Sequence, residues 1–193
     1  LNAPNHDILI VGGGGAGLRA AIAAVQADES ISVGLVSKVY PMRSPTVSAE
    51  GGSARVIRAD KEDSLDLHAF DTIKGSDFLA DQDVVEAFVK EAAEELIQLE
   101  HWGCPWSRDP DGRISVRPFR GMSVERTHYA ADNTRLHILH ALYQTSLQFD
   151  RIHRYDEWYV TKLLLNEEGA AAGVAAINGR SGAIHAIPAK AVI

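Results

Sequence analysis

The residues of this chain that are best suited to chemistry form a cluster of glycines near its N-terminus. Gly12, Gly14 and Gly17 follow the spacing G-x-G-x-x-G. The residues between them are also small: Gly13, Gly15 and Ala16. Glycine at the first position permits a tight turn, at the second it lets the backbone approach a diphosphate, and at the third it lets a helix pack closely on a strand. The spacing therefore predicts a site where main-chain amides at a helix N-terminus bind the diphosphate of a dinucleotide.

The sequence around these glycines supplies the elements that such a site requires. An apolar run from Ile8 to Val11 precedes them, and an alanine-rich segment, residues 16–27, follows with a helical pattern. Residues Ile31–Val36 predict a second strand that lies parallel to the first after a right-handed crossover. A glycine-rich loop in an ordinary α/β core is the alternative, but the strand–turn–helix context favours the dinucleotide site.

The spacing does not decide which dinucleotide is bound. NAD-type sites place an acidic residue about 20 residues after the glycines, where it holds the adenosine ribose. Residues 32–39 contain no acid and include Ser37 and Lys38. A lysine at this place could favour the 2′-phosphate of NADP, or it could accompany an FAD site in which a hydroxyl holds the ribose.

Composition narrows the class of protein. The chain has 193 residues and a net charge of −7, with scattered basic residues, which argues against a nucleic-acid surface. Cys104 is the single cysteine, so an internal disulfide is impossible and a reducing compartment is expected. Its setting between two tryptophans predicts a packed thiol rather than a nucleophile. The sequence has no apolar run near the roughly 18 residues of a membrane span and no secretory pattern.

The rest of the chain predicts further helices and strands. We expect an amphipathic helix at Asp81–Glu100 and a second helix at Thr134–Phe149. Between them, residues 105–122 form a loop-like stretch that turns at residues 109–112. On the first helix, Val85, Phe88 and Val89 fall on the predicted apolar face. Strand patterns cover Tyr155–Leu165 and a hairpin at Gly173–Ile187. Residues 189–193 resemble the start of another buried strand, which suggests a polypeptide that has been cut.

Several longer motifs carry a resemblance to a known family. They are SKVYPMRS at residues 37–44, TVSAEGGS at 46–53, DTIKGSD at 71–77, DQDVV at 81–85, LEHWGCPWSR at 99–108, ERT at 125–127 and AAD at 130–132. Together they strongly resemble the flavoprotein subunit of fumarate reductase and succinate dehydrogenase. The segment WGCPWSR is more similar to the fumarate reductase branch.

This resemblance implies a fold and a cofactor. The fold is an α/β, Rossmann-like FAD-binding domain with a parallel sheet, helices and a β-hairpin appendage, and residues 1–193 form its N-terminal part, without the capping and substrate region. The cofactor is FAD. Its pyrophosphate lies at the glycine turn, its ribose at residues 37–39, its flavin ring along residues 46–53 and its adenine at residues 158–160. The implied cofactor-binding residues are Gly12, Gly13, Gly14, Gly15, Ala16, Gly17, Ser37, Lys38, Val39, Ser44, Pro45, Thr46, Val47, Ser48, Ala49, Glu50, Gly51, Gly52, Ser53, Trp158, Tyr159 and Val160.

Two residues depart from the family pattern. Pro45 stands where the family usually has the histidine that bonds covalently to the flavin 8α-methyl group. Proline offers no side-chain nucleophile, so we expect non-covalent FAD with a lowered potential that favours fumarate reduction. Arg135 stands where the family usually has a glycine at a close-packed helix start, which brings the local packing into question.

The resemblance also implies partners and a location. Subunits of this family exchange electrons with an iron–sulfur subunit, which meets membrane anchor subunits, so we expect a cytoplasmic chain that is peripheral at the inner face of the membrane. The family's catalytic residues belong to the missing region, so none is assigned here, and a dicarboxylate substrate and turnover require that region. The competing interpretation is a non-catalytic FAD or NAD(P) binding module from a truncated, degenerate or engineered variant.

Other candidate residues have simpler interpretations. His137 and His140 are three apart on a predicted helix, but no third strong ligand accompanies them, so packed or capping roles are favoured over a metal site. His68 and Asp71 are expected to have a hydrogen-bonded structural role. Glu50 is the acidic residue that we expect near the flavin ring.

Overall fold

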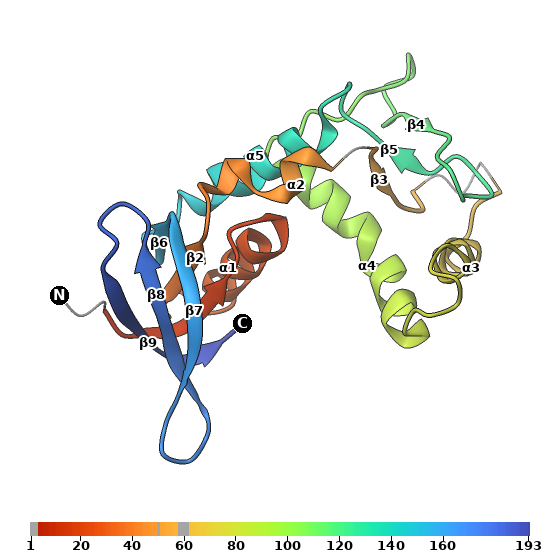
Figure 1. Cartoon of the computed structure of the whole chain (residues 1–193). Helices are drawn as coiled ribbons and strands as arrows, with labels where there is room; N and C mark the ends of the chain where they lie inside the picture. Colours follow the sequence, from red (N-terminus) through yellow and green to blue (C-terminus); the bar gives the residue numbers. More distant parts are fainter. Residues whose placement is uncertain (1–3, 50, 58–61) are drawn as a thin grey trace. The chain divides into compact units, whose positions relative to one another are not determined.

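The structure is a computed structural model that describes residues 4–49, 51–57 and 62–193 (Figure 1). The chain divides into two compact units. Unit 1 comprises Leu1–Ser48 and Leu139–Ile193, and unit 2 comprises Ala49–Ile138. None of the helices within the described ranges combines the length and the apolar character needed to cross a membrane.

Unit 1 is built on a six-stranded sheet with the order β6-β2-β1-β9-β8-β7. Strands β6, β2, β1 and β9 are parallel to their neighbours, whereas β9, β8 and β7 form antiparallel pairs. The bounds are β1 His6–Val11, β2 Val33–Ser37, β6 Ile152–Asp156, β7 Trp158–Leu165, β8 Ala171–Asn178 and β9 Ile184–Val192. The predicted parallel sheet with a hairpin appendage is therefore confirmed.

Helix α1, Gly15–Ala27, connects the first two strands and contacts both of them. Its buried face consists of Leu18, Ala21, Ile22 and Val25, which recur at helical spacing. The parallel pairing of β1 with β2, in which Ile8 lies opposite Val33, confirms the expected strand–helix–strand order.

The core of the sheet lies where the parallel and antiparallel parts join. A cluster of buried apolar side chains fills it, consisting of Leu9, Val36, Val174, Ala176, Ile187 and Ala189. Gly173 in β8 has a φ of 138°, and an added Cβ there would overlap the carbonyl oxygen of Ile187. A side chain at this position would therefore push the two strands apart.

Two strand predictions in unit 1 were wrong in detail. The expected strand Tyr155–Leu165 is interrupted at Glu157, which has a φ of 65°, so that the chain leaves β6 and begins β7 at another edge of the sheet. Residues 189–193 do not start a new strand. Residues 189–192 are the last part of β9, which pairs with β8 on one side and with β1 on the other.

Prolines divide the segment after β2 into two short helical pieces. A 3-10 turn covers Pro41–Arg43, and helix α2 covers Pro45–Ser48. Each begins at a proline, which is tolerated in the first helical turn because its missing N–H has no partner there. Helix α5, Thr134–Ser146, ends three residues earlier than predicted, and its residues after 138 belong to unit 1.

Unit 2 contains a helical hairpin and a small antiparallel sheet. Helix α3 is Leu65–Gly75 and helix α4 is Gln82–His101, and they contact each other. The sheet has the order β3-β5-β4, with β3 Ser53–Ala54, β5 Thr127–His128 and β4 Val116–Arg117. Neither α3 nor this sheet was predicted from the sequence.

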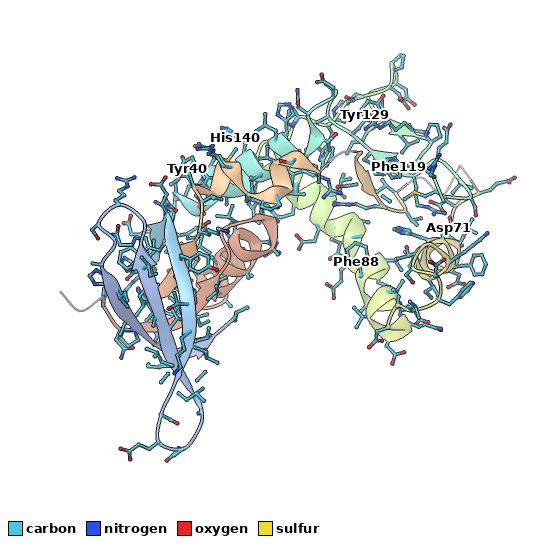
Figure 2. The ribbon with its side chains drawn as sticks, viewed as in Figure 1. Tyr40, Asp71, Phe88, Phe119, Tyr129 and His140 are labelled. Carbon is cyan, nitrogen blue, oxygen red and sulfur yellow. The ribbon has the colours of Figure 1, made fainter. Side chains whose placement is uncertain are left out.

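The amphipathic prediction for α4 is largely confirmed. Its buried residues are Val85, Val89, Ala92, Leu96 and Leu99, and Asp81 caps the helix by accepting a hydrogen bond from the amide of Val84. Phe88 was placed on this apolar face, but it is 57% exposed. Figure 2 shows Phe88 on α4, and Asp71 on the neighbouring helix α3.

A buried ion network ties α3 to the loops of unit 2. Arg126 is 1% exposed, and its guanidinium donates to Asp63 at 2.7 Å and to Asp71 at 2.6 Å. Ser123 also donates to Asp71, through its amide at 2.8 Å and its hydroxyl at 2.6 Å. Burial opposes ionisation of Asp71, but these hydrogen bonds and the Arg126 charge outweigh it and lower the pKa of Asp71.

Candidate functional site

The glycine turn has the geometry that its sequence predicts. Gly12 has a φ of 132°, in the region that favours glycine, and its amide donates to the carbonyl of Val36 at 2.8 Å. An added Cβ on Gly17 would overlap the carbonyl oxygen of Gly12. The expected tight turn and close packing of helix on strand are both present.

The N-terminus of α1 leaves main-chain donors available. Gly14 is the N-cap residue and supplies no side-chain cap, and the first turn carries no acidic side chain. The amide of Gly15 donates to Thr46 Oγ1 at 3.1 Å. Within the described part of the chain, the amides of Gly13, Gly14 and Ala16 have no hydrogen-bond acceptor. A helix end with unpaired N–H groups is a natural site for an anion.

A cavity and an unpaired hydroxyl adjoin these amides. The cavity has a volume of 420 Å³, and it is lined by the glycine turn, Thr46, Ile193 and neighbouring residues. Ser44 Oγ is buried without a partner among the described residues. It lies 3.7 Å from the place where a Cβ on Gly14 would stand. Buried polar atoms are normally paired, so amides and hydroxyl together fit the oxygen-rich diphosphate of a dinucleotide.

The residues expected at the adenosine end also come together in unit 1. A smaller cavity of 200 Å³ is lined by Val11, Gly12, Val36, Lys38, Trp158, Tyr159 and Val160. Lys38 Nζ lies 5.4 Å from the centre of the Tyr159 ring, within range of a cation–π interaction. The hydroxyl of buried Ser37 donates to the carbonyl of Val39.

The segment expected along the flavin is divided between the two units. Pro45, Thr46, Val47 and Ser48 form α2 in unit 1, where Pro45 is exposed. Ala49 and Gly51 to Ser53 belong to unit 2. Glu50, which was expected near the flavin, lies outside the described residues.

The glycine pair at residues 51 and 52 lies close to other residues of unit 2. Gly51 has a φ of 102°, and a Cβ there would meet the Phe119 ring at 2.8 Å. A Cβ on Gly52 would overlap the carbonyl oxygen of His128 in β5. The groups that lie close to this pair in the structure therefore belong to the protein itself.

Two arginines hold the carbonyls of this pair. Arg117 Nη2 donates to the carbonyl of Gly51 at 2.6 Å, and Arg135 Nη2 donates to the carbonyl of Gly52 at 3.1 Å. Arg135, the second departure from the family pattern, is thus accommodated at the start of α5 by a hydrogen bond to the main chain.

Several secondary candidates have clear environments. Asp71 accepts hydrogen bonds from Arg126 and Ser123. His68 is buried, and its Nδ1 has no hydrogen-bond partner among the described residues. Burial, together with the nearby Arg126 charge, lowers the pKa of His68. Cys104 is 2% exposed, which confirms a packed thiol, and this burial raises the pKa of the thiol to about 12.

The described residues were also compared with the requirements of a metal site. In the ranges that the structure describes, no three His, Cys, Asp or Glu side chains are placed to hold an ion, and this includes the region of His137 and His140.

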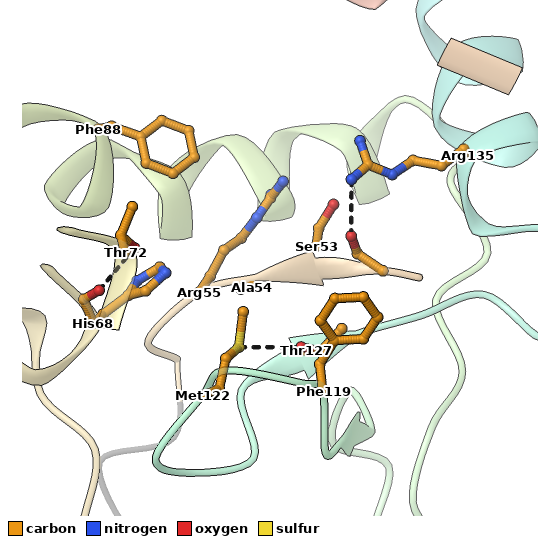
Figure 3. Close-up of a pocket in the computed structure, with 11 residues that line it drawn as sticks. Ser53, Ala54, Arg55, His68, Thr72, Phe88, Phe119, Met122, Thr127 and Arg135 are labelled. Carbon is orange, nitrogen blue, oxygen red and sulfur yellow. Dashed lines mark hydrogen bonds between the residues drawn. The ribbon is translucent and has the colours of Figure 1, made fainter. Parts of the chain in front are cut away.

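Sequence reasoning missed the residues that line a further cavity in unit 2. Arg55, Phe88 and the loop residues Phe119 and Met122 come from three separate segments and meet there (Figure 3). Nothing in their spacing along the chain marks them as neighbours.

Comparison with known proteins places the chain in a family. Residues 7–193 match the FAD binding domain family. The chain is 58% identical over 188 residues to the fumarate reductase flavoprotein subunit of Mycobacterium tuberculosis, which covers 97% of this chain and 32% of that protein. It is 41% identical over 195 residues to the succinate dehydrogenase flavoprotein subunit of Rickettsia bellii, covering 97% of this chain and 32% of that protein. The higher identity agrees with the predicted fumarate reductase branch.

A solved structure agrees with these sequence matches. The chain superposes on a quinol fumarate reductase of Escherichia coli with a TM-score of 0.93 and 52% identity, covering 100% of this chain and 32% of that one. The chain thus spans about a third of the length of the relatives that it matches. It belongs to the FAD binding domain family and corresponds to the FAD-binding domain of fumarate reductase flavoprotein subunits.

Proposed function

We propose that this chain binds FAD without a covalent bond and forms the N-terminal part of the flavin domain of a fumarate reductase. The proposal rests on two kinds of polar group at the glycine turn that have no hydrogen-bond partner among the described residues. The main-chain amides at the N-terminus of α1 and the buried hydroxyl of Ser44 converge where a diphosphate fits.

Each residue has a binding or orienting task in this proposal. The amides of Gly13, Gly14 and Ala16 donate to the diphosphate, and the glycines keep side chains away from it. Lys38 and residues 158–160 receive the adenosine. The cavities at the glycine turn and at Lys38 share the lining residues Val11 and Gly12, which supports one continuous ligand along unit 1.

When bound, FAD supplies hydride transfer through flavin N5. In this proposal residues 46–53 lie along the flavin ring. Arg117 and Arg135 hold the carbonyls of Gly51 and Gly52, so the peptide planes of this pair are fixed before any ligand arrives. Fixed main-chain amides lower the cost of ordering the site.

Pro45 is the reason to propose a non-covalent cofactor. Its ring carbons cannot bond to the flavin methyl group, and the first turn of α2 accepts proline without strain. Loss of the electron-withdrawing linkage lowers the flavin potential, and this direction favours the reduction of fumarate over the oxidation of succinate.

The function of the complete protein extends beyond this chain. The relatives are named flavoprotein subunits of fumarate reductase or succinate dehydrogenase, and the chain spans about a third of them. We propose fumarate–succinate interconversion for the complete protein. Its partners are an iron–sulfur subunit and membrane anchor subunits that hold it at the inner face of the membrane. The dicarboxylate site and turnover need the remaining two-thirds.

A second candidate is a non-catalytic nucleotide-binding module. Pro45 favours it, because it removes the attachment point of the family cofactor, and Lys38 leaves NADP as a possible ligand. The two candidates differ in what they bind and in whether a completed protein turns over fumarate.

The direct experiment is to purify the chain, saturate it with FAD and follow the flavin after denaturation. The proposal expects yellow holoprotein whose flavin passes entirely into the filtrate once the chain is unfolded. Flavin that stays with the unfolded chain would contradict non-covalent binding. A chain that ignores FAD and binds NADP would contradict the cofactor assignment.

Catalysis is tested separately from binding. The proposal expects the FAD-loaded chain to give no fumarate-dependent oxidation of a reduced dye, because the substrate region is missing. Reoxidation that depends on fumarate would show that this third of the protein is already sufficient.

A further inference from the structure

The turn that joins β8 to β9 contains two neighbouring residues that can react with each other. Asn178 is the last residue of β8, and Gly179 follows it in an exposed turn (Figure 1). They form the one Asn-Gly pair of the sequence. The main-chain nitrogen of a glycine can attack the side-chain carbonyl of a preceding asparagine, because glycine has no side chain that hinders the approach. Neither residue is among those proposed for FAD.

The side-chain carbonyl of Asn178 is polarised by the turn. Its Oδ1 accepts hydrogen bonds from the amides of Arg180 at 2.9 Å and Ser181 at 3.2 Å. When a nucleophile adds to this carbonyl, negative charge develops on Oδ1, where two donors already stand. Preorganised donors of this kind stabilise the tetrahedral intermediate of acyl transfer. The side chain of Asn178 is therefore an activated electrophile in the folded chain.

The amide of Gly179 is restrained by a residue outside the turn. It donates a hydrogen bond to the main-chain carbonyl of Glu157 at 2.8 Å. To react, the Gly179 nitrogen must lose its proton to a base in the solvent and turn toward the Asn178 side chain. A carbonyl oxygen is too weak a base to take this proton. The hydrogen bond to Glu157 therefore opposes the attack, and the folded chain combines an activated carbonyl with a restrained nucleophile.

The restraining carbonyl depends on an unusual backbone conformation. Glu157 lies at the junction of β6 with β7 and has a φ of 65°, which is uncommon for a residue other than glycine. Because Trp158 pairs with Asn178 across the antiparallel strands β7 and β8, the residue before Trp158 lies beside the residue after Asn178. A Cβ on Gly179 would stand 2.6 Å from the Glu157 carbonyl oxygen, so this close approach requires glycine. Backbone strain of this kind persists only where the surrounding fold maintains it.

The turn between β7 and β8 offers an internal comparison. Asn166 Oδ1 accepts hydrogen bonds from the amides of Glu168 at 3.0 Å and Ala170 at 2.8 Å, so its carbonyl is polarised in the same way. The residue after Asn166 is Glu167, whose side chain hinders the main-chain nitrogen. Among the described residues, the amide of Glu167 has no acceptor. Asn166 thus has the activated carbonyl, but neither the glycine neighbour nor the restraint.

We propose that Asn178 is a site of spontaneous deamidation whose rate is set by the hydrogen bond from Gly179 to Glu157. When this bond opens, the Gly179 amide gives its proton to solvent base, and its nitrogen forms a bond to Asn178 Cγ. The side-chain amide leaves as ammonia after it takes a proton from water. Water then opens the succinimide ring to aspartate or isoaspartate at position 178. Isoaspartate directs the main chain through the side-chain carbon, which lengthens the turn between β8 and β9.

The test follows deamidation in the full chain during incubation at mildly alkaline pH, without FAD. Proteolysis at mildly acidic pH and mass spectrometry of the peptides report the conversion of each asparagine. We expect Asn178 to react at least about tenfold more slowly in the folded chain than in the chain unfolded in urea, because reaction requires local opening. Asn166 should remain an amide in both states, since its neighbour is not glycine.

Matched variants at position 157 test the restraint itself. Glu157→Val and Glu157→Gly both remove the ion pair with Arg180, but only valine disfavours a positive φ. Glu157→Val should therefore deamidate at Asn178 at least about tenfold faster than the parent chain, whereas Glu157→Gly should keep the parent rate. Circular dichroism identifies a variant that fails to fold.

A variant in the other turn tests the proposal without changing position 157. In Glu167→Gly, Asn166 gains a glycine neighbour whose amide has no carbonyl to restrain it. We expect Asn166 to react at least about tenfold faster than Asn178 in the same molecule. Because residue 167 is exposed in a turn, this variant remains informative if Glu157→Val unfolds.

Three results would overturn the proposal. The first is an equal rate at Asn178 in the folded and the urea-unfolded parent chain. The second is an equal rate at Asn178 in folded Glu157→Val and folded Glu157→Gly. The third is a rate at Asn166 in Glu167→Gly that does not exceed the rate at Asn178. Since no step involves FAD, each of these results would leave the proposed cofactor function untouched.

Discussion

At the scale of single residues, the glycines of the opening turn have separable roles. Gly17 faces the protein, since a Cβ there would overlap the main-chain carbonyl of Gly12. Gly14 faces the space expected for the ligand, and a Cβ there would meet only Thr46 Oγ1 at 3.2 Å and Ser44 at the edge of contact. A side chain at position 17 should therefore disturb the fold, whereas a side chain at position 14 should disturb ligand binding.

Replacing Gly17 by alanine should destabilise the chain itself. The added methyl group cannot coexist with the Gly12 carbonyl, so α1 must move away from β1. We expect a loss of about 1–3 kcal/mol in the free energy of unfolding, as for other overpacked sites. Urea denaturation measures it, with Gly75→Ala as the control because a Cβ there meets nothing within 4 Å. Equal free energies of unfolding for Gly17→Ala and Gly75→Ala would contradict the close contact between Gly17 and the Gly12 carbonyl.

Arg126 is the residue on which the ion network of unit 2 depends. Replacing it by leucine leaves the carboxylates of Asp63 and Asp71 buried and without their cation. We expect a loss of about 3–5 kcal/mol in the free energy of unfolding. Arg120→Leu, which removes an exposed arginine, should change stability little. A loss as small as that of the control would show that the network is dispensable.

The sequence predicted residue roles well only where local backbone geometry decides them. The turn at Gly12 and the packing at Gly17 follow from strand–turn–helix geometry, which a short window contains. Phe88 fits the same helical period as Val85 and Val89, yet it is exposed because α3 covers only part of that face. Arg55 and Arg135, which line the cavity of unit 2, are 80 positions apart in the chain, and no local pattern joins them.

At the scale of elements, α4 is held by a narrow buried stripe. Leu96 is fully buried, and its carbonyl accepts a hydrogen bond from the indole of Trp106 at 3.2 Å. Ile97, the next residue, is 43% exposed. Neighbouring residues on one helix therefore face different environments, which makes them a matched pair.

Replacing each residue of this pair by alanine should separate the effect of buried packing on stability from the effect of helix propensity. Leu96→Ala leaves a cavity and should cost about 2–5 kcal/mol of unfolding free energy. Ile97→Ala loses little burial and should stay within about 0.5 kcal/mol of the parent chain. Chemical denaturation of both variants provides the comparison. Equal losses would mean that the assigned face of α4 is wrong.

A histidine links strand β1 to strand β6 and to the residue before strand β2. His6 in β1 is buried, with Nδ1 2.9 Å from Ser32 Oγ and Nε2 2.8 Å from the Tyr155 hydroxyl in β6. Burial, and secondarily the proximity of His153, lowers the pKa of His6. The unfolded chain therefore takes up a proton at a higher pH than the folded chain does.

This linkage predicts a loss of stability on acidification. The contribution of neutral His6 is complete above the unfolded pKa of about 6.5 and is lost as the pH falls from there toward the lowered folded value. His6→Gln keeps a hydrogen-bonding side chain but removes the titration. Its unfolding temperature should therefore fall less than that of the parent chain as the pH is lowered below about 6.5. If the unfolding temperatures of the parent chain and of His6→Gln fell equally on acidification, the titration of His6 would not contribute to the loss of stability.

The long elements were predicted more reliably than the short ones. Helix α4 and the β8–β9 hairpin repeat their pattern over enough residues to be recognised, and the predicted ends differ by only a few positions. The three two-residue strands of unit 2 have no such pattern, because tertiary contacts fix them. Helix α3 was missed although Ser64 caps it, since Phe70 and Leu65 break its apolar stripe by facing solvent.

At the scale of the whole molecule, the residues proposed for FAD are not distributed evenly. Those for the diphosphate and adenosine all belong to unit 1, whereas Ala49 and Gly51 to Ser53 belong to unit 2. We therefore expect most of the cofactor affinity to come from the six-stranded sheet of unit 1 and its first helix, α1. The fold class and the family could be predicted from sequence because the motifs run through both units.

The most direct test measures FAD affinity in the parent chain and in Gly14→Ala. The φ of −79° at Gly14 suits alanine, and no main-chain atom lies within contact of the added methyl group, so the fold should survive. We predict that the parent chain quenches flavin fluorescence on binding. Gly14→Ala should bind FAD at least about tenfold more weakly, at an unchanged unfolding temperature. Equal affinity in the two folded proteins would contradict the claim that the bared amides of this turn hold the diphosphate.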